Sequence, residues 1–321
     1  MGYLQVLVED FQIVERLQLV RYIVNLFFAI ITRMRIVKTL TSDGLKLTGF
    51  LSEPENQKKD SIIVHIHGMA GDPYTNAWYP YFHKLFPENG IAFLVGNHRG
   101  TGSITMFSRE PEKYPNYGDA LELFEESVFD IDVWVQCAEN LGYKNICIQS
   151  HSFAPSKVVY YLNQEKPDFV NKLVFISPVD MLGLTLSKPK EYKEMLSESV
   201  RLVEEGRGNR LLTRLLDGEY YISAGTYANL FSEDSKANIF CYTDRKHDWS
   251  MVNEIDRPVL VIGGTKDMPM EVVSSSEKAL NILKKQLIKS PKVKTVIYKG
   301  AGHSFEGYEA RIVNDVANFL H

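Results

Sequence analysis

The chain has 321 residues, of which 45% are hydrophobic and 24% charged, and this composition is typical of a globular protein with a full apolar core. The formal net charge is −4, and no basic arm or face stands out, which argues against a nucleic-acid partner. The chain has three cysteines, an odd number: Cys137, Cys147 and Cys241. We therefore expect free thiols in a reducing, cytoplasmic compartment.

The first element in the chain is an apolar run over residues 22–32, flanked by arginines. It is too short to span a bilayer, which takes about twenty residues. We expect no signal peptide, because acidic residues precede the run and no small-residue cleavage site follows it. We predict an N-terminal apolar helix within residues 1–34 that packs on the rest of the chain or forms a homodimer contact. Contact with a membrane surface is the alternative.

From residue 35 onward, apolar strands alternate with amphipathic helices. This pattern predicts an α/β fold with a mostly parallel sheet of about eight strands. The first two strands are joined as a hairpin by an Asp-Gly turn. The predicted strands are 35–40, 45–51, 61–66, 91–96, 145–149, 172–176, 259–262 and 294–298. The predicted helices are 76–86, 120–141, 155–163, 272–287 and 309–320.

The alternation breaks between residues 180 and 256, where no apolar run has the quality of a core strand. Two helices are predicted here, over 191–205 and 209–216, and a segment rich in aromatic residues follows them. Its aromatic side chains are Tyr220, Tyr221, Tyr227, Phe231, Phe240, Tyr242 and Trp249. Each of them either holds this segment to the core or lines a pocket. Together they favour an apolar or aromatic substrate.

The run Asn-Ile-Cys-Ile-Gln-Ser-His-Ser-Phe-Ala, residues 145–154, predicts a strand, a sharp turn centred on Ser152 and then a helix. This is the arrangement of a nucleophile elbow, in which only small residues fit two positions before and after the central serine. Ser150 and Ala154 stand where glycines are usual, so the size requirement is met. A serine between strand and helix is otherwise most often a helix N-cap. Further parts of a site are therefore needed to support the interpretation.

The other residues that a serine nucleophile needs occur later in the chain. A serine hydroxyl needs a histidine base and a carboxylate that orients the histidine. Asp267 follows the seventh predicted strand, and His303 lies in the glycine-rich loop after the eighth. The order Ser, Asp, His, each after a strand, predicts a catalytic triad of Ser152, Asp267 and His303. We expect His151, beside the nucleophile, to have a packing role.

Other polar motifs in the sequence give weaker evidence of a functional site. His65 and His67 lie on one strand, but the third ligand that a metal site requires is not placed near them in the sequence. Gly96, Gly100 and Gly102 have the wrong spacing for a dinucleotide fingerprint. We predict that the protein uses neither a metal nor another cofactor.

Upstream of the serine, the predicted strand 61–66 runs into His67-Gly68-Met69. An oxyanion hole at such a site uses the backbone N–H of the residue after the nucleophile and one from the loop after this strand. Those amides belong to Phe153 and Met69. With these parts in this order, the chain from about Thr39 to its C-terminus resembles the α/β-hydrolase superfamily. The segment Asn-His-Arg-Gly-Thr-Gly-Ser, residues 97–103, is also similar to a loop of that family.

The resemblance implies the α/β-hydrolase fold, with a core formed by residues 35–179 and 257–321. It implies that residues 180–256 are a helical cap inserted over the active site. Within this insertion, residues 221–230 are similar to a subgroup that contains fungal siderophore-ester hydrolases.

We therefore expect a serine hydrolase that cleaves a carboxylic ester, thioester or lactone of a small molecule through an acyl-enzyme intermediate. Epoxide hydrolases and dehalogenases of this fold need an aspartate at the elbow, so Ser152 excludes them. The sequence leaves open an acyltransferase or thioesterase that acts on a carrier-bound acyl chain, and a hydrolase of carbon–carbon bonds. It also leaves open a ligand-binding protein that has kept the fold without catalysis.

Overall fold

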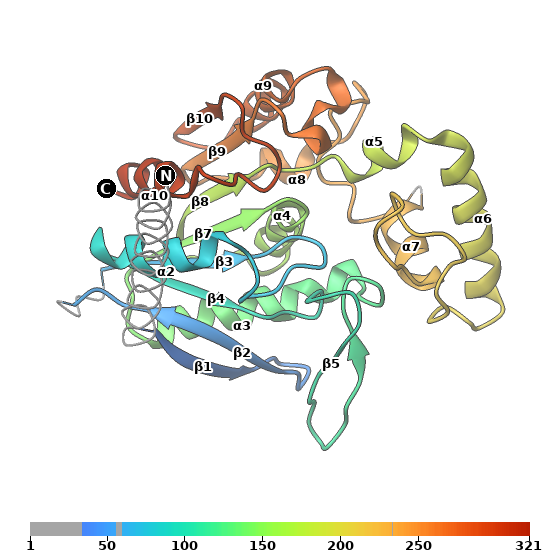
Figure 1. Cartoon of the computed structure of the whole chain (residues 1–321), viewed down its shortest axis with the longest axis horizontal. Helices are drawn as coiled ribbons and strands as arrows, with labels where there is room; N and C mark the ends of the chain where they lie inside the picture. Colours follow the sequence, from blue (N-terminus) through green and yellow to red (C-terminus); the bar gives the residue numbers. More distant parts are fainter. Residues whose placement is uncertain (1–33, 56–59, 233) are drawn as a thin grey trace, which may run out of the picture.

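The computed structural model of the chain describes residues 34–55, 60–232 and 234–321 (Figure 1). The strands are β1 (Met34–Leu40), β2 (Lys46–Ser52), β3 (Ser61–Ile66), β4 (Ile91–Gly96), β5 (Thr105–Met106), β6 (Asn116–Tyr117), β7 (Asn145–His151), β8 (Val170–Ile176), β9 (Val259–Gly264) and β10 (Val293–Tyr298). The α-helices are α2 (Trp78–Glu88), α3 (Ser127–Asn140), α4 (Ala154–Glu165), α5 (Met181–Leu186), α6 (Pro189–Glu204), α7 (Ala224–Phe231), α8 (Ser250–Asn253), α9 (Ser276–Gln286) and α10 (Glu309–Leu320). Two 3₁₀ helices are η1 (Phe124–Glu126) and η2 (Met268–Val273).

The described strands form an eight-stranded sheet in the order β1-β2-β4-β3-β7-β8-β9-β10, and β5 and β6 pair separately as a ribbon. β1 and β2 are an antiparallel hairpin, β2 is antiparallel to β4, and the remaining strands are parallel. The prediction of a mostly parallel sheet of about eight strands is confirmed. Every residue of β4 and β9 is buried, as expected for strands covered on both faces.

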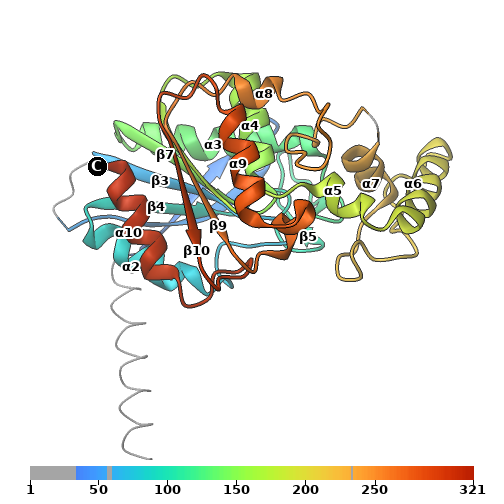
Figure 2. The same cartoon turned by 90° about the horizontal axis from the view of Figure 1, so that it is seen from above.

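Helices cover both faces of the sheet (Figure 2). On one face, α2 and α10 share an apolar cluster with the strands, to which they contribute Trp78, Tyr79, Phe82, Phe86, Ile312, Val313, Val316 and Phe319. On the other face, α3, α4 and α9 contribute Ile131, Trp134, Val135, Val158, Val159, Leu162, Leu280 and Leu283. Two separate apolar layers therefore hold the sheet rigid, and its loops extend from a fixed frame.

Residues 180–256, which we call the inserted segment, lie between β8 and β9 and add no strand to the sheet. Both views show α6 and α7 beside the sheet body rather than over its layers (Figures 1 and 2). The N-terminal end of α7 is fixed to the core, since the Thr226 hydroxyl donates to the carbonyls of Ala120 and Glu122. Asn229 accepts from the backbone N–H of Phe124 at 2.8 Å.

This attachment explains one wrong prediction. The helix expected over residues 120–141 begins only at Ser127, after the 3₁₀ turn η1. The carbonyl of Ala120 accepts from the backbone N–H of Ser223 as well as from Thr226. Hydrogen bonds from a distant part of the chain thus take the place of the first helical turns.

The helix predicted over residues 209–216 is also wrong. Here Leu212 N–H donates to the carbonyl of Ile222, and Leu216 N–H donates to that of Tyr220. These amides bond to a later loop, so the i→i−4 bonds of a helix do not form. The helices α5, α7 and α8 and the ribbon β5–β6 had no prediction of their own.

The predicted N-terminal apolar helix lies outside the described residues, apart from Met34, which opens β1. Across the described ranges, no helix has the length and apolar character needed to cross a membrane. Cys137, Cys147 and Cys241 are all free thiols.

Candidate active site

The turn between β7 and α4 has the backbone of a nucleophile elbow. Ser152 sits between the last residue of β7 and the start of α4 with φ of +62°, in the left-handed region that non-glycine residues rarely adopt. Ser150 and Ala154 are fully buried where strand and helix cross. Their small side chains allow this close crossing, as the sequence predicted, without the two usual glycines.

The three residues predicted as a triad are joined by hydrogen bonds. His303 Nε2 lies 2.9 Å from Ser152 Oγ, and His303 Nδ1 lies 2.8 Å from Asp267 Oδ1. Asp267 is fully buried on the loop after β9, and His303 is partly exposed on the loop after β10. Because a carboxylate only accepts, Nδ1 carries the proton and Nε2 is left to accept from the serine hydroxyl. This is the tautomer that a general base at Ser152 requires.

The loop after β3 lies against the serine. A Cβ atom on Gly68 would come within 2.8 Å of Ser152 Cβ, so only glycine allows this approach. The backbone N–H groups of Met69 and Phe153 form no hydrogen bond to any other described residue. These two N–H groups therefore remain available as donors near the nucleophile. They are the two amides that the sequence predicted for an oxyanion hole.

A network of neutral histidines holds this loop. The Thr101 hydroxyl oxygen accepts from the backbone N–H of His98 at 3.0 Å and lies 3.0 Å from Nε2 of the His67 ring. The other ring nitrogen of His67, Nδ1, lies 3.0 Å from the Gly68 carbonyl oxygen. The rings of His67 and His98 are stacked with centroids 3.8 Å apart. Burial lowers the pKa of His67 to about 4 and that of His98 well below its ordinary value. Both rings are therefore uncharged at neutral pH, and they brace the loop.

His151 has a more specific position than the packing role that we predicted. Its Nε2 lies 3.0 Å from the carbonyl of His303, and its ring meets the Trp78 indole edge-on at 4.6 Å. The Trp78 indole N–H in turn donates to the carbonyl of Ser304. The side chains of His151 and Trp78 thus hold the backbone of the His303 loop. The sequence offered no signal for this contact, since Trp78 is 225 positions away from His303.

A buried charged cluster, formed by Asp119, Glu122 and Lys157, lies beneath Phe153. Lys157 Nζ donates to both carboxylate oxygens of Glu122 at 2.6 and 2.7 Å, and it lies 5.3 Å from the Phe153 ring centroid. Asp119 is nearly fully buried, and its Oδ1 has no hydrogen-bond partner among the described residues. Burial, with the nearby charge of Glu122, raises the pKa of Asp119 to about 7. Sequence reasoning missed this cluster, because a single lysine in an amphipathic helix is usually exposed.

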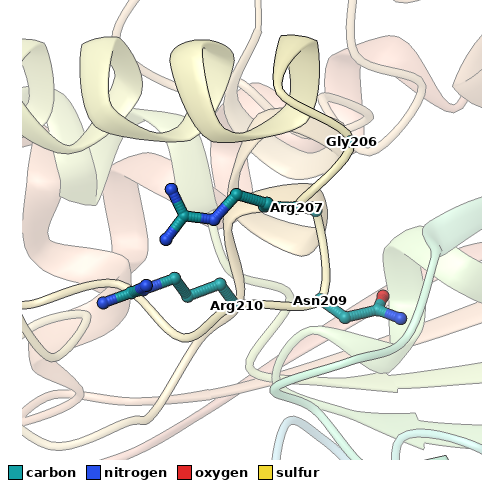
Figure 3. Close-up of a pocket in the computed structure, with 5 residues that line it drawn as sticks. Gly206, Arg207, Asn209 and Arg210 are labelled. Atoms are coloured by element: carbon teal, nitrogen blue, oxygen red, sulfur yellow. The ribbon is translucent and has the colours of Figure 1, made fainter.

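No described group of three or more His, Cys, Asp or Glu side chains is placed to hold a metal ion. A surface hollow is present on the inserted segment, in the turn after α6, and is lined by residues 206–210. Figure 3 shows Arg207 and Arg210 extended to one side of this turn and Asn209 to the other. Arg207 pairs with Glu205 at 2.7 Å. The hollow contains none of the residues around Ser152.

Known structures share this architecture. Est1E from Butyrivibrio proteoclasticus with ferulic acid bound aligns with a TM-score of 0.59 and 19% identity, over 88% of this chain and 98% of that one. The α/β hydrolase GrgF from Penicillium sp. sh18 aligns with a TM-score of 0.61 and 18% identity, over 89% and 97%. A soluble variant of monoglyceride lipase from Saccharomyces cerevisiae, in complex with a substrate analogue, aligns with a TM-score of 0.61 and 14% identity, over 88% and 93%. At these identities the likeness shows the fold alone.

No curated protein matches the sequence. The sequence model of the alpha/beta hydrolase fold family matches residues 61–305, which is well over half of the chain and spans every residue of the hydrogen-bonded site. With the eight-stranded sheet and the elbow already described, this match identifies the family. The chain belongs to the α/β-hydrolase fold family.

Proposed function

We propose that the protein is a serine hydrolase that cleaves carboxylic esters, thioesters or lactones. The observation that carries the proposal is the hydrogen-bonded chain from Asp267 through His303 to a Ser152 held at positive φ. A serine in this backbone conformation, with an imidazole nitrogen 2.9 Å from its hydroxyl oxygen, is arranged as a nucleophile with its base.

In the proposed acylation step, Ser152 Oγ attacks the substrate carbonyl carbon while its proton moves to His303 Nε2. The carbonyl oxygen becomes an oxyanion that accepts from the N–H groups of Met69 and Phe153, each donor contributing roughly 3 kcal/mol of transition-state stabilisation. The tetrahedral intermediate then expels the alkoxide or thiolate, which takes the proton from Nε2. Asp267 stabilises the transient imidazolium through Nδ1–H.

In the deacylation step, water takes the place of the leaving group. It gives a proton to His303 Nε2 as its oxygen attacks the acyl carbon, and the second tetrahedral intermediate collapses to the carboxylic acid. The proton returns to Ser152 Oγ, which restores the resting state. The balance of the cycle is one ester and one water consumed, and one acid and one alcohol or thiol released.

We propose that the inserted segment acts as a cap and that the acyl group is apolar or aromatic. Five of its eight aromatic residues are buried within the segment or against the core and so serve packing: Tyr227, Phe231, Phe240, Tyr242 and Trp249. Support for the substrate class therefore rests on apolar side chains that remain exposed, among them Tyr221 of the segment and Met268 directly after Asp267. The ferulic acid in Est1E and the lipase activity named for the yeast neighbour suggest which acyl groups to test first.

The test is covalent labelling followed by a substrate panel. The full chain and a Ser152→Ala variant are treated with a fluorophosphonate probe, and the modified residue is located by mass spectrometry. Hydrolysis is then measured on p-nitrophenyl esters of graded chain length, methyl ferulate, a monoacylglycerol and an acyl thioester. We expect a single adduct on Ser152 and turnover of at least one ester series. Equal labelling of both proteins, or a labelled enzyme that turns over none of the esters and thioesters, would contradict the proposal.

A further inference from the structure

Ser177 contacts the carboxylate that orients the histidine. It is the first residue after β8, the strand that lies between β7 and β9. Its hydroxyl donates to Asp267 Oδ2, whereas Asp267 Oδ1 faces His303. Both Ser177 and Asp267 are completely buried. Among the described residues, no other side chain donates to Oδ2.

The backbone around Ser177 is tied to both neighbouring strands. Ser177 N–H donates to the carbonyl of Ile262 in β9 at 2.8 Å. The preceding carbonyl, of Ile176, accepts from Ser152 N–H at 3.0 Å, and Val179 N–H donates to the Ser152 carbonyl at 3.3 Å. The segment 176–179 therefore connects the elbow directly to the strand that leads to Asp267.

This segment holds Ser177 in an uncommon conformation. The φ of Ser177 is +49°, and such a conformation in a residue other than glycine persists only where the surroundings enforce it. The inserted segment supplies one such restraint. The Tyr242 hydroxyl donates to the carbonyl of Pro178 at 2.8 Å, and Tyr242 N–H donates to the Asp180 carboxylate at 2.7 Å. The neighbouring strands and the inserted segment therefore together fix the direction of the Ser177 side chain.

We propose that Ser177 is a positioning residue for the triad. This inference rests on the proposed hydrolase function. A buried carboxylate with one donor on each oxygen cannot rotate without losing a hydrogen bond, so Oδ1 stays aimed at His303 Nδ1. Without the Ser177 hydroxyl, Oδ2 is left buried without its donor. The carboxylate is then free to turn, and the imidazole loses the fixed orientation that proton transfer requires.

Loss of the Ser177 hydroxyl should also change the pH dependence of kcat/KM. Once the Ser177 hydroxyl no longer offsets the charge of the Asp267 carboxylate, the negative potential at the imidazole is stronger, whichever carboxylate oxygen faces Nδ1. The imidazolium is therefore stabilised relative to the neutral ring. The acid limb of kcat/KM should move to higher pH, since the ring must be neutral to accept the Ser152 proton. A residue that served only the stability of the fold would leave this midpoint in place.

Three substitutions separate the hydroxyl from the backbone. Ser177→Ala removes the hydroxyl alone, Ser177→Gly also relieves the positive φ, and Ser177→Cys keeps a weaker donor. The matched control is Ser276→Ala, since Ser276 is fully buried and its Oγ has no partner among the described residues. We expect the Ala and Gly variants to lose about 10- to 100-fold in kcat with KM nearly unchanged, the Cys variant to lose less, and the control to match wild type. A Gly variant with wild-type kcat, or an unmoved acid limb in the Ala variant, would overturn the proposal.

The double variant Ser177→Ala/Asp267→Asn tests whether Ser177 acts through Asp267. If it does, adding Ser177→Ala to Asp267→Asn costs little further activity, because the two residues act as one unit. Fully multiplied losses would overturn the inference. The rate of fluorophosphonate labelling of Ser152 serves as a readout that needs no substrate. Wild type that fails to label refutes the proposed function, whereas wild type and Ser177→Ala that label at equal rates refute only the role of Ser177.

Discussion

A Cβ atom built on Gly68 would lie 2.8 Å from Ser152 Cβ and 3.3 Å from Ser152 Oγ. The approach follows from strand register: Ile66 of β3 is paired with Ser150 of β7, so the residues two positions further along face one another. The loop that carries Met69 N–H therefore reaches the nucleophile only if residue 68 has no side chain.

Gly68→Ala should fold but lose about 100-fold in kcat, because the methyl group displaces either the serine or the Met69 amide, and one misplaced oxyanion donor costs about this much. Activity on the best p-nitrophenyl ester is the measurement. Gly208→Ala is the control, since a Cβ there meets its nearest atom at an ordinary 3.7 Å. Wild-type kcat in Gly68→Ala would show that the loop does not form the oxyanion site.

Ser152→Ala and His303→Ala should each reduce kcat by several orders of magnitude, and the double variant should be little worse than either. The effects of substituting residues that act as a unit are not additive, because a general base cannot contribute to the rate once the nucleophile that it activates has been removed. The test is the kcat of the three variants, normalised to total protein concentration, and circular dichroism checks that they fold. Losses that multiply would mean that Ser152 and His303 act independently.

The sequence predicted the sheet well because its strands are continuous apolar runs. The bounds of β3 and β4 are the predicted ones, since both strands are buried and are followed by glycine or polar residues. The elbow was also predictable, because it depends on small residues at fixed positions within ten consecutive residues. The hydrogen bonds among Ser152, Asp267 and His303 follow from parallel strands whose ends meet at one edge.

What the sequence did not predict depends on contacts between distant residues. Residues 120–126 have helical character locally, yet their carbonyls accept from Ser223 and Thr226 more than ninety positions later. Ser177 and Lys157 are ordinary residues until the fold places them beside Asp267 and Glu122. No local pattern marks a side chain whose importance comes from its partner.

Trp78→Phe should lower kcat about tenfold with little change in KM. The substitution keeps an aromatic ring beside His151 but removes the indole N–H that donates to the Ser304 carbonyl, which holds the His303 loop. Trp134→Phe is a matched control, since it removes an indole N–H that donates to the Asn97 carbonyl, away from that loop. Equal loss of kcat in the two variants would show that the effect is one of general stability.

Asp119→Asn should stabilise the protein above neutral pH. The folded-state pKa of Asp119 is raised to about 7, from an ordinary value of 3.8, by burial and by the charge of Glu122, with Lys157 opposing the shift. Between about pH 4 and pH 7 the folded protein keeps a proton on Asp119 that the unfolded chain has released. The free energy of unfolding therefore falls as pH rises through this window, and the loss is complete above it.

The asparagine variant cannot ionise, so its stability should not fall in this way. We expect its free energy of unfolding to be close to wild type near pH 4.5 and to exceed it by on the order of 2–4 kcal/mol at pH 8, since each pKa unit corresponds to about 1.4 kcal/mol. Urea unfolding at several pH values between these limits provides the measurement. Asp168→Asn, at an exposed position, is the control and should track wild type throughout. A difference between Asp119→Asn and wild type that stays constant from pH 4.5 to pH 8 would show that Asp119 does not titrate in this range.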